Sequence, residues 1–125
     1  MLHPFASDIK TLSPLTLAFI GDGVYEMYIR EKLVSKGNAP MSKINPEKQR
    51  LASAKFQSSL IEKLLPSLTE QEISVFKRGR NAKVSNIPKN GDHESYHNAT
   101  GFEALIGYLY LSDEHERMLE LLKIV

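Results

Sequence analysis

The chain has 125 residues, no cysteine, and 16 basic against 15 acidic side chains, which gives a net charge of +1. The absence of cysteine excludes a disulfide scaffold, a zinc finger with cysteine ligands, an iron–sulfur cluster and a thiol nucleophile. This length suits one compact core, so we expect residues 1–125 to form a single domain. No apolar run approaches the roughly 20 residues that span a bilayer, and residues 1–10 lack the features of a signal peptide, so we expect a cytoplasmic protein with no membrane partner.

Caps and helix breakers divide the chain into helices, and we find no convincing strand-like alternation, which together predict an all-α fold. Ser13-Pro14 begins the first helix as N-cap and first helical residue, and Gly37 ends it. Asn45-Pro46 repeats this start signal, and one narrow apolar face follows it until Pro66 ends the second helix.

The second half of the chain is predicted to hold three more helical segments. Thr69 and Glu72 have the spacing of a capping box for a short helix that Gly79 can terminate. Residues 100–111 are apolar on nearly every side, which is typical of a buried central helix. The last, amphipathic helix has its apolar side chains at Leu119, Leu122 and Val125.

A long loop is predicted from Arg80 to Tyr96, because this segment is rich in Asn, Gly and Pro. Loops longer than about 12 to 15 residues without structure of their own are uncommon in compact domains and are usually functional or disordered. No acidic residue occurs from residue 73 to residue 91, whereas the basic residues in this stretch are Lys77, Arg78, Arg80, Lys83 and Lys89. The charge pattern indicates a locally basic face or loop.

Gly21-Asp22-Gly23 is unusual inside a helix, because each glycine costs about 1 kcal/mol relative to alanine in a helix interior. Helical spacing places Asp22 on a largely apolar side of the helix, with Ala18, Phe19, Tyr25, Glu26 and Ile29. The small neighbours permit close approach by another helix or by a ligand. The alternative is that the helix breaks here and Asp22 caps a second short helix beginning at Gly23.

Glu103 is the only acid in the apolar stretch of residues 100–111. A glutamate is almost never fully buried unless it is paired, protonated or bound to a metal. If Asp22 and Glu103 meet, their repulsion favours a hard divalent cation with oxygen ligands, and magnesium is the first candidate. The alternatives are a first-turn acid stabilised by the helix dipole, or a salt bridge to an arginine.

Two segments together resemble a known family. Residues 17–24, LAFIGDGV, resemble the signature helix of the ribonuclease III catalytic domain, and residues 102–107, FEALIG, resemble its second acidic motif. Closer still is the Mini-III ribonuclease subfamily, which consists of that catalytic domain without a double-stranded RNA-binding domain. The segments similar to Mini-III proteins are residues 17–30, 78–83, 88–90 and 99–111. The resemblance implies that residues 1–125 form one all-α, homodimeric ribonuclease III endonuclease domain.

The implied activity is endonucleolytic cleavage of double-stranded RNA by metal-assisted hydrolysis, which leaves 5′-phosphate and 3′-hydroxyl ends. Carried over by position, Asp22 and Glu103 are the catalytic carboxylates and the ligands of Mg²⁺, for which Mn²⁺ can substitute. Ala18 and Thr100 occupy the positions of two further acids in the ordinary ribonuclease III pattern, a reduction that Mini-III proteins share. The number of metal ions per site therefore stays open. The implied substrate is the large-subunit (23S) ribosomal RNA precursor, whose ends are trimmed, with a ribosomal protein as a candidate partner.

The resemblance also places Phe19 at the dimer interface, inserted into the partner, so that two sites face a shared groove and each addresses one strand. The alternative is that Phe19 packs inside its own subunit. Duplex RNA is recognised mostly through phosphate and 2′-hydroxyl contacts, which need donors and positive charge. We therefore expect the RNA-binding residues to be Lys77, Arg78, Arg80, Asn81, Lys83 and Lys89. The alternative for this charge run is a solvated face.

Two other functions stay open from the sequence. One is a catalytically inactive ribonuclease III-like domain that serves as an RNA-binding, ribosome-associated structural module. The presence of both Asp22 and Glu103 argues against it, because an inert scaffold has no need of an acid in an apolar helix. The other is a helical protein-interaction domain, which would leave the basic stretch and the paired motifs unexplained.

Overall fold

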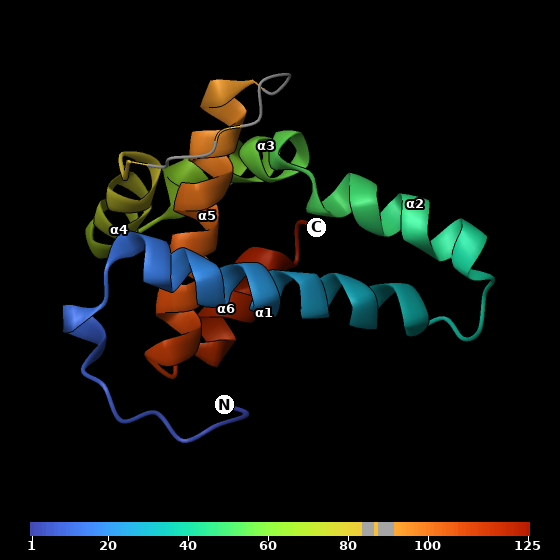
Figure 1. Ribbon diagram of the computed structural model, residues 1–125, viewed down its shortest axis with the longest axis horizontal. Helices are drawn as coiled ribbons and strands as arrows, with labels where there is room; N and C mark the ends of the chain where they lie inside the picture. Colours follow the sequence, from blue (N-terminus) through green and yellow to red (C-terminus); the bar gives the residue numbers. More distant parts are fainter. Residues whose placement is uncertain (84–86, 88–91) are drawn as a thin grey trace.

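The computed structural model describes residues 1–83, 87 and 92–125, and in these residues every regular element is helical, which confirms the all-α prediction (Figure 1). In chain order they are the 3-10 helix η1 (Ile9–Thr11), α1 (Pro14–Val34), α2 (Met41–Ala52), α3 (Ala54–Leu64), the 3-10 helix η2 (Leu65–Ser67), α4 (Glu70–Arg80), α5 (His93–Leu111) and α6 (His115–Leu122). Among the described helices, none has the length and apolar character needed to cross a membrane.

Helix α5 is the buried centre of the fold, as its continuous apolar sequence predicts. Helices α1, α3 and α4 pack against it, and α6 contacts it at its C-terminal end (Figure 1). Five of its side chains are completely buried, namely Phe102, Ala104, Leu105, Ile106 and Leu109. The core continues into α1 through Tyr25, whose ring meets that of Phe102 edge-on at 5.3 Å between centroids. Burial of this apolar surface is the main stabilising contribution to such a domain.

The prediction of the second helix is wrong in two respects, namely the residue at which it begins and the expectation that it is unbroken. Helix α2 begins at Met41, and Pro46 lies inside it rather than at its first position. The chain then leaves helical geometry at Ser53, whose ψ of 151° separates α2 from α3. The Ser53 hydroxyl accepts a hydrogen bond from the Phe56 N–H at 3.1 Å and so caps α3. The apolar periodicity runs through both helices, and it therefore concealed a break that depends on a local cap.

Helix α1 and helix α2 lie beside each other as a hairpin (Figure 1). The buried Tyr25 hydroxyl donates to the Leu51 carbonyl oxygen at 2.7 Å, and the Lys48 ammonium donates to a Glu26 carboxylate oxygen at 2.8 Å. These contacts join α1 to α2.

Helix α4 confirms the capping box but not its predicted end. The Thr69 hydroxyl accepts from the Glu72 N–H at 3.1 Å, and the Glu72 carboxylate accepts from the Thr69 N–H at 2.9 Å. Gly79 does not terminate the helix, which runs to Arg80. Gly79 is instead buried against α5. A Cβ at this position would lie only 2.9 Å from the Gly101 Cα on α5. The glycine serves close helix packing and not termination.

The predicted loop from Arg80 to Tyr96 is too long at both ends. Arg80 belongs to α4, and α5 begins at His93, with Asp92 as its N-cap. The Asp92 carboxylate accepts from the Glu94 N–H at 3.0 Å and from the Ser95 hydroxyl at 2.8 Å. Residues 84–86 and 88–91 lie outside the described residues.

The last helix is amphipathic as predicted, and one of its three predicted apolar positions is wrong. Leu122 is buried, together with Met118 and Leu121 of helix α6, and Val125 packs against the same core. Leu119 is exposed instead.

Candidate active site

Two glycines allow α1 and α5 to cross in close contact. A Cβ on Gly21 would overlap the backbone carbonyl of Glu103, and a Cβ on Gly107 would overlap the backbone carbonyl of Leu17. Only a residue without Cβ lets the two backbones approach this far. Gly23 has nothing within 4 Å of its Cβ position, so packing does not explain this second glycine. Helix α1 is unbroken through these residues, and the alternative of a helix break at Asp22 is therefore wrong.

The crossing brings the carboxyl groups of Asp22 and Glu103 together. Asp22 is exposed on α1 and Glu103 is half-buried on α5. Burial in the first place, and then the charge and hydrogen bonding of Asp22, raise the pKa of the Glu103 carboxyl to about 8. Both structural alternatives for Glu103 are wrong, since it lies in the middle of α5 and makes no salt bridge among the described residues.

Gln57 on α3 is a further polar residue at this site, and the sequence analysis missed it. Its side chain is 2% exposed, and its Nε2 lies 3.5 Å from Oε2 of Glu103 and donates to the Ala52 carbonyl oxygen at 3.0 Å. Its Oε1 is buried and has no hydrogen-bond partner in the part of the chain that the structure describes. The sequence does contain a sign of its burial: the residues three, four and seven positions after Gln57 are Leu60, Ile61 and Leu64, which places the amide on the apolar side of the helix.

The positions of the two missing acids hold buried side chains that offer no charge. Ala18 and Thr100 are both buried, and the Thr100 hydroxyl donates to the Tyr96 carbonyl oxygen of its own helix at 3.0 Å. Within the described ranges, no group of three or more His, Cys, Asp or Glu side chains converges as a metal site would require.

The site nevertheless fits a hard divalent cation. Two carboxyl groups lie together, and Glu103 has no positive partner among the described residues to offset its charge. The same amide of Gln57 that contacts Glu103 through Nε2 also has a buried oxygen, Oε1, without a partner among the described residues. Magnesium prefers oxygen ligands and is commonly held by one or two carboxylates together with water or phosphate oxygens. The small number of protein ligands at this site therefore suits Mg²⁺, which keeps several water ligands, better than an ion that must be coordinated by protein groups alone.

The basic end of α4 lies beside the same part of α5. Gly79 touches Gly101 and Ala104, which places the flanking Arg78 and Arg80 near the turn that carries Glu103. The exposed members of the predicted RNA-binding set are Lys77, Arg78, Asn81 and Lys83. Arg80 is half-buried, with its guanidinium 5.5 Å from the centre of the Phe76 ring and its Nε 3.3 Å from Asn81 Oδ1. Lys89 lies outside the described residues.

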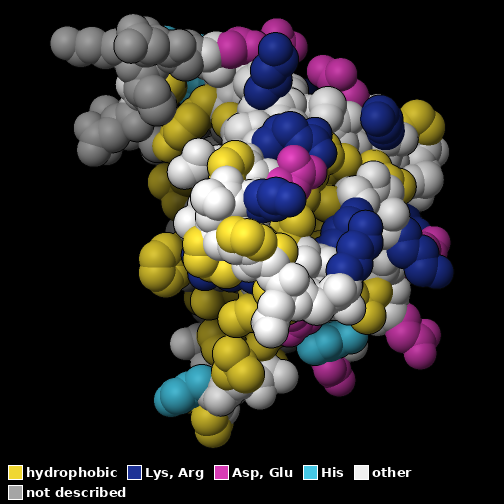
Figure 2. Space-filling model, turned by 90° about the vertical axis from the view of Figure 1, so that its right-hand side faces the viewer, with side chains coloured by type: hydrophobic (Ala, Val, Ile, Leu, Met, Phe, Trp, Pro, Cys, Tyr) yellow, Lys and Arg dark blue, Asp and Glu magenta, His cyan; other side chains and the backbone are white. Residues whose placement is uncertain are grey.

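The charges on the side formed by α2 are arranged differently. Figure 2 shows this side of the molecule, where Lys and Arg side chains gather with acidic side chains next to them. Arg50 pairs with Glu47 at 2.6 Å and Lys48 pairs with Glu26 at 2.8 Å. No such ion pair involves the basic residues at the end of α4 within the described residues. The end of α4 is therefore the stronger candidate for binding a polyanion.

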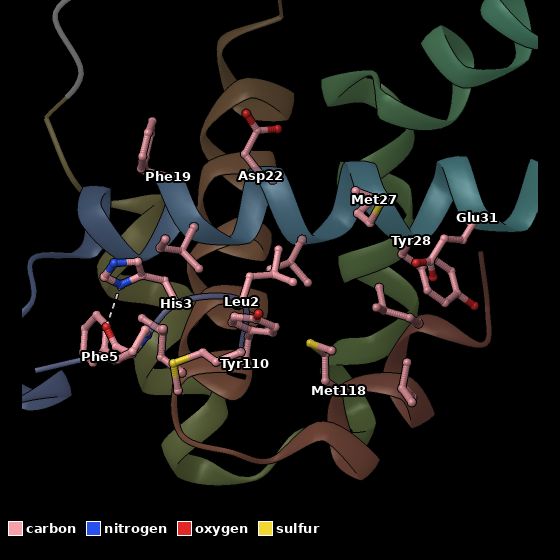
Figure 3. A pocket seen from close by; sticks show the side chains of 18 residues that line it. Leu2, His3, Phe5, Phe19, Asp22, Met27, Tyr28, Glu31, Tyr110 and Met118 are labelled. Atoms are coloured by element: carbon pink, nitrogen blue, oxygen red, sulfur yellow. Dashed lines mark hydrogen bonds between the residues drawn. The ribbon is translucent and has the colours of Figure 1, made fainter.

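Phe19 is 79% exposed, so the alternative that it packs inside its own subunit is wrong. Phe19 and Asp22 project from the same side of α1 (Figure 3). A largely apolar cleft of about 790 Å³ runs along α1, between the N-terminal segment and α6, and Phe19 lies on its border. An exposed apolar surface of this kind is typical of an interaction site.

Comparison with known proteins identifies related chains. Residues 15–114 match the family model described as "Ribonuclease III domain". A protein of Symbiobacterium thermophilum named Mini-ribonuclease 3 is 45% identical over 113 residues, which cover 90% of this chain and 87% of that protein. A protein of the same name from Enterococcus faecalis is 45% identical over 117 residues, with 92% and 89% covered.

A solved structure agrees with this likeness. The crystal structure of a Fusobacterium nucleatum protein superposes with a TM-score of 0.86 at 30% sequence identity and covers 95% of each chain. The two acids, the two glycines of the helix crossing and the basic end of α4 all lie within the matched residues 15–114.

Proposed function

Because the chain belongs to the ribonuclease III family, and Mini-ribonuclease 3 proteins are among its relatives, we propose that it is a magnesium-dependent endoribonuclease for double-stranded RNA. The products are 5′-phosphate and 3′-hydroxyl ends. The observation that carries this proposal is that the carboxyl groups of Asp22 and Glu103 meet where α1 crosses α5, a helix contact that requires Gly21.

Asp22 and Glu103 would hold the metal through their carboxylate oxygens, and Mn²⁺ would fit the same ligands. When bound, Mg²⁺ supplies a Lewis acid that polarises a phosphoryl oxygen and lowers the pKa of a water molecule. Asp22 is exposed on α1, so its oxygens are accessible to a phosphodiester from solvent. Glu103 reaches the same site from the core side, where its carboxyl group is partly buried.

The RNA duplex is proposed to contact Lys77, Arg78, Arg80, Asn81 and Lys83, together with Lys89. The ammonium, guanidinium and amide groups donate to phosphate and 2′-hydroxyl oxygens, which do not depend on base sequence. The closeness of Gly79 to the turn that carries Glu103 supports a continuous surface from the basic end of α4 to the two acids.

A homodimer with Phe19 in the interface would give two such sites, one for each strand of the duplex. The exposure of Phe19 beside an apolar cleft supports this arrangement. The finer part of the proposal is the substrate, the ends of the 23S ribosomal RNA precursor in the cytoplasm, with a ribosomal protein as a partner. It rests on the resemblance to Mini-III proteins.

The test is incubation of the purified protein with a long RNA duplex or a matched single strand, in Mg²⁺ or in EDTA. We expect Mg²⁺-dependent cleavage of the duplex alone, and loss of cleavage in Asp22→Asn and in Glu103→Gln, because each removes one of two charged ligands. Glu116→Gln, at an exposed position of α6, is the matched control and should cleave normally. Tight duplex binding without cleavage by the unmodified protein would favour the structural module instead.

A further inference from the structure

Among the described residues, Gln57 is the side chain from a third helix, α3, that hydrogen-bonds to one of the two acids, Glu103. It lies on α3, and its amide links the last residue of α2, Ala52, to Glu103 in the middle of α5. An amide that is 2% exposed costs free energy unless its polar groups are used, so its burial in this position calls for a reason.

We propose that Gln57 is a positioning residue, whose amide N–H holds the Glu103 carboxylate in the orientation that binds the divalent cation. The inference rests on the proposed function, since it concerns the same site. It adds a residue that neither the motif pattern nor the likeness to relatives assigns.

The hydrogen-bond partners determine which way the Gln57 amide faces. The Ala52 carbonyl and the Glu103 carboxylate are both acceptors, so the NH₂ group must face them, with one hydrogen for each. The Ala52 bond at 3.0 Å anchors the amide, and the second hydrogen is left for Glu103. At 3.5 Å the contact with Glu103 is long, whereas a charge-assisted N–H···O⁻ bond is about 2.7 to 2.9 Å. We expect this contact to shorten when Glu103 carries its charge.

A site with two carboxylates depends strongly on the orientation of each. The glutamate side chain has several rotatable bonds, and binding an ion in one rotamer costs conformational entropy unless that rotamer is already held. In metal sites generally, partners that hydrogen-bond to a ligating carboxylate perform this task. Gln57 is placed to do this for Glu103.

The first test is Mn²⁺ binding to the metal-free protein, followed by electron paramagnetic resonance. Gln57→Met keeps the length of the side chain and removes the donor, and we expect Mn²⁺ affinity to fall about 10- to 100-fold. In duplex cleavage, kcat should fall while KM for RNA stays unchanged, because the RNA contacts are elsewhere. Gln49→Met makes the same change at an exposed position of α2 and should bind Mn²⁺ normally. Unchanged affinity in folded Gln57→Met would overturn the inference.

The second test uses the unmodified protein, so it does not depend on how a variant folds. Addition of Mg²⁺ should shift the nuclear magnetic resonance signals of the Gln57 side-chain NH₂ group, with those of Gln49 and Gln71 as unshifted controls. A Gln57 signal that stays in place while Mg²⁺ binds would show that Gln57 does not act on the site. If the unmodified protein binds neither ion, the proposed function fails first, and the two failures are thereby distinguished.

Discussion

At the scale of single residues, Glu103 shows a conflict between folding and function. Burial and the nearby Asp22 both favour its protonated form, and the donor from Gln57 opposes them only in part, so the pKa rises from 4.5 to about 8. In metal-free protein, ionisation of Glu103 therefore destabilises the fold. Functional carboxylates often show such shifts, because the arrangement that binds a cation is unfavourable without one.

The first prediction concerns the pH dependence of stability in EDTA. Between pH 4.5 and about 8 the folded protein binds the Glu103 proton and the unfolded chain does not. The contribution of Glu103 to the free energy of unfolding is thus fully present below pH 4.5 and is lost as pH rises through about 8. Glu103→Gln should remove this component, so the variant gains stability relative to the parent protein as pH rises. Urea unfolding at several pH values measures the difference, and a constant difference would contradict the prediction.

At the scale of elements, Gly21 and Gly23 look equivalent in the sequence and differ in the fold. Gly21 faces α5, where its missing Cβ permits contact with the Glu103 carbonyl, and Gly23 faces open space. The first glycine thus sets how deeply the two acid-bearing helices approach each other. The second contributes no packing within the subunit.

The corresponding prediction compares two alanine variants. Gly21→Ala forces α1 away from α5 and should lower the free energy of unfolding by about 1 to 3 kcal/mol. It should also weaken metal binding, because it separates Asp22 from Glu103. Gly23→Ala should raise the free energy of unfolding by up to about 1 kcal/mol, since alanine is the better helix former. Denaturant unfolding decides between them, and a change of the same sign and size in both would refute the role assigned to Gly21.

The capping box of α4 shows which contacts of a residue can be predicted from its neighbours in the sequence and which cannot. Thr69 and Glu72 cap the helix as their spacing predicts, but Glu72 is also buried and bound by Arg117 from α6, with both hydrogen bonds at 2.9 Å. The second Arg117 nitrogen also donates to the Ser67 carbonyl oxygen at 2.9 Å. Arg117, with the helix-capping hydrogen bonds, holds the pKa of Glu72 below its usual range. The local pattern identified the cap, and only the packing of α6 supplied the arginine.

At the scale of the whole molecule, a net charge of +1 conceals an uneven distribution. Lys48 and Arg50 on α2 are paired with acids, whereas the basic residues at the end of α4 have no ion pair among the described residues. Counterion release makes the binding of nucleic acid depend on salt in proportion to the number of phosphate contacts. The position of the charge, and not its sum, thus supports the proposal that RNA binds at the end of α4.

The prediction at this scale is a change in salt dependence. The double variant Arg78→Ala and Arg80→Ala should bind duplex RNA more weakly and reduce the slope of log affinity against log salt by about 1 per lost phosphate contact. The matched control, Lys48→Ala with Arg50→Ala, removes the same charge from paired positions on α2 and should leave the slope unchanged. Binding titrations at several salt concentrations give the slopes, and an unchanged slope for the α4 variant would exclude that helix end from the interface.

The sequence by itself determined the helical class, the start of α1 at Ser13, the capping box of α4 and the two acids that do not suit their surroundings, because caps and residue periodicity are properties of neighbouring residues. The tertiary structure decided that Asp22 and Glu103 meet, that Gly21 rather than Gly23 makes the helix contact, and that Gln57 reaches Glu103. These outcomes depend on which helix faces cross and how closely the backbones approach, and residues far apart in the chain carry no local signal of that geometry.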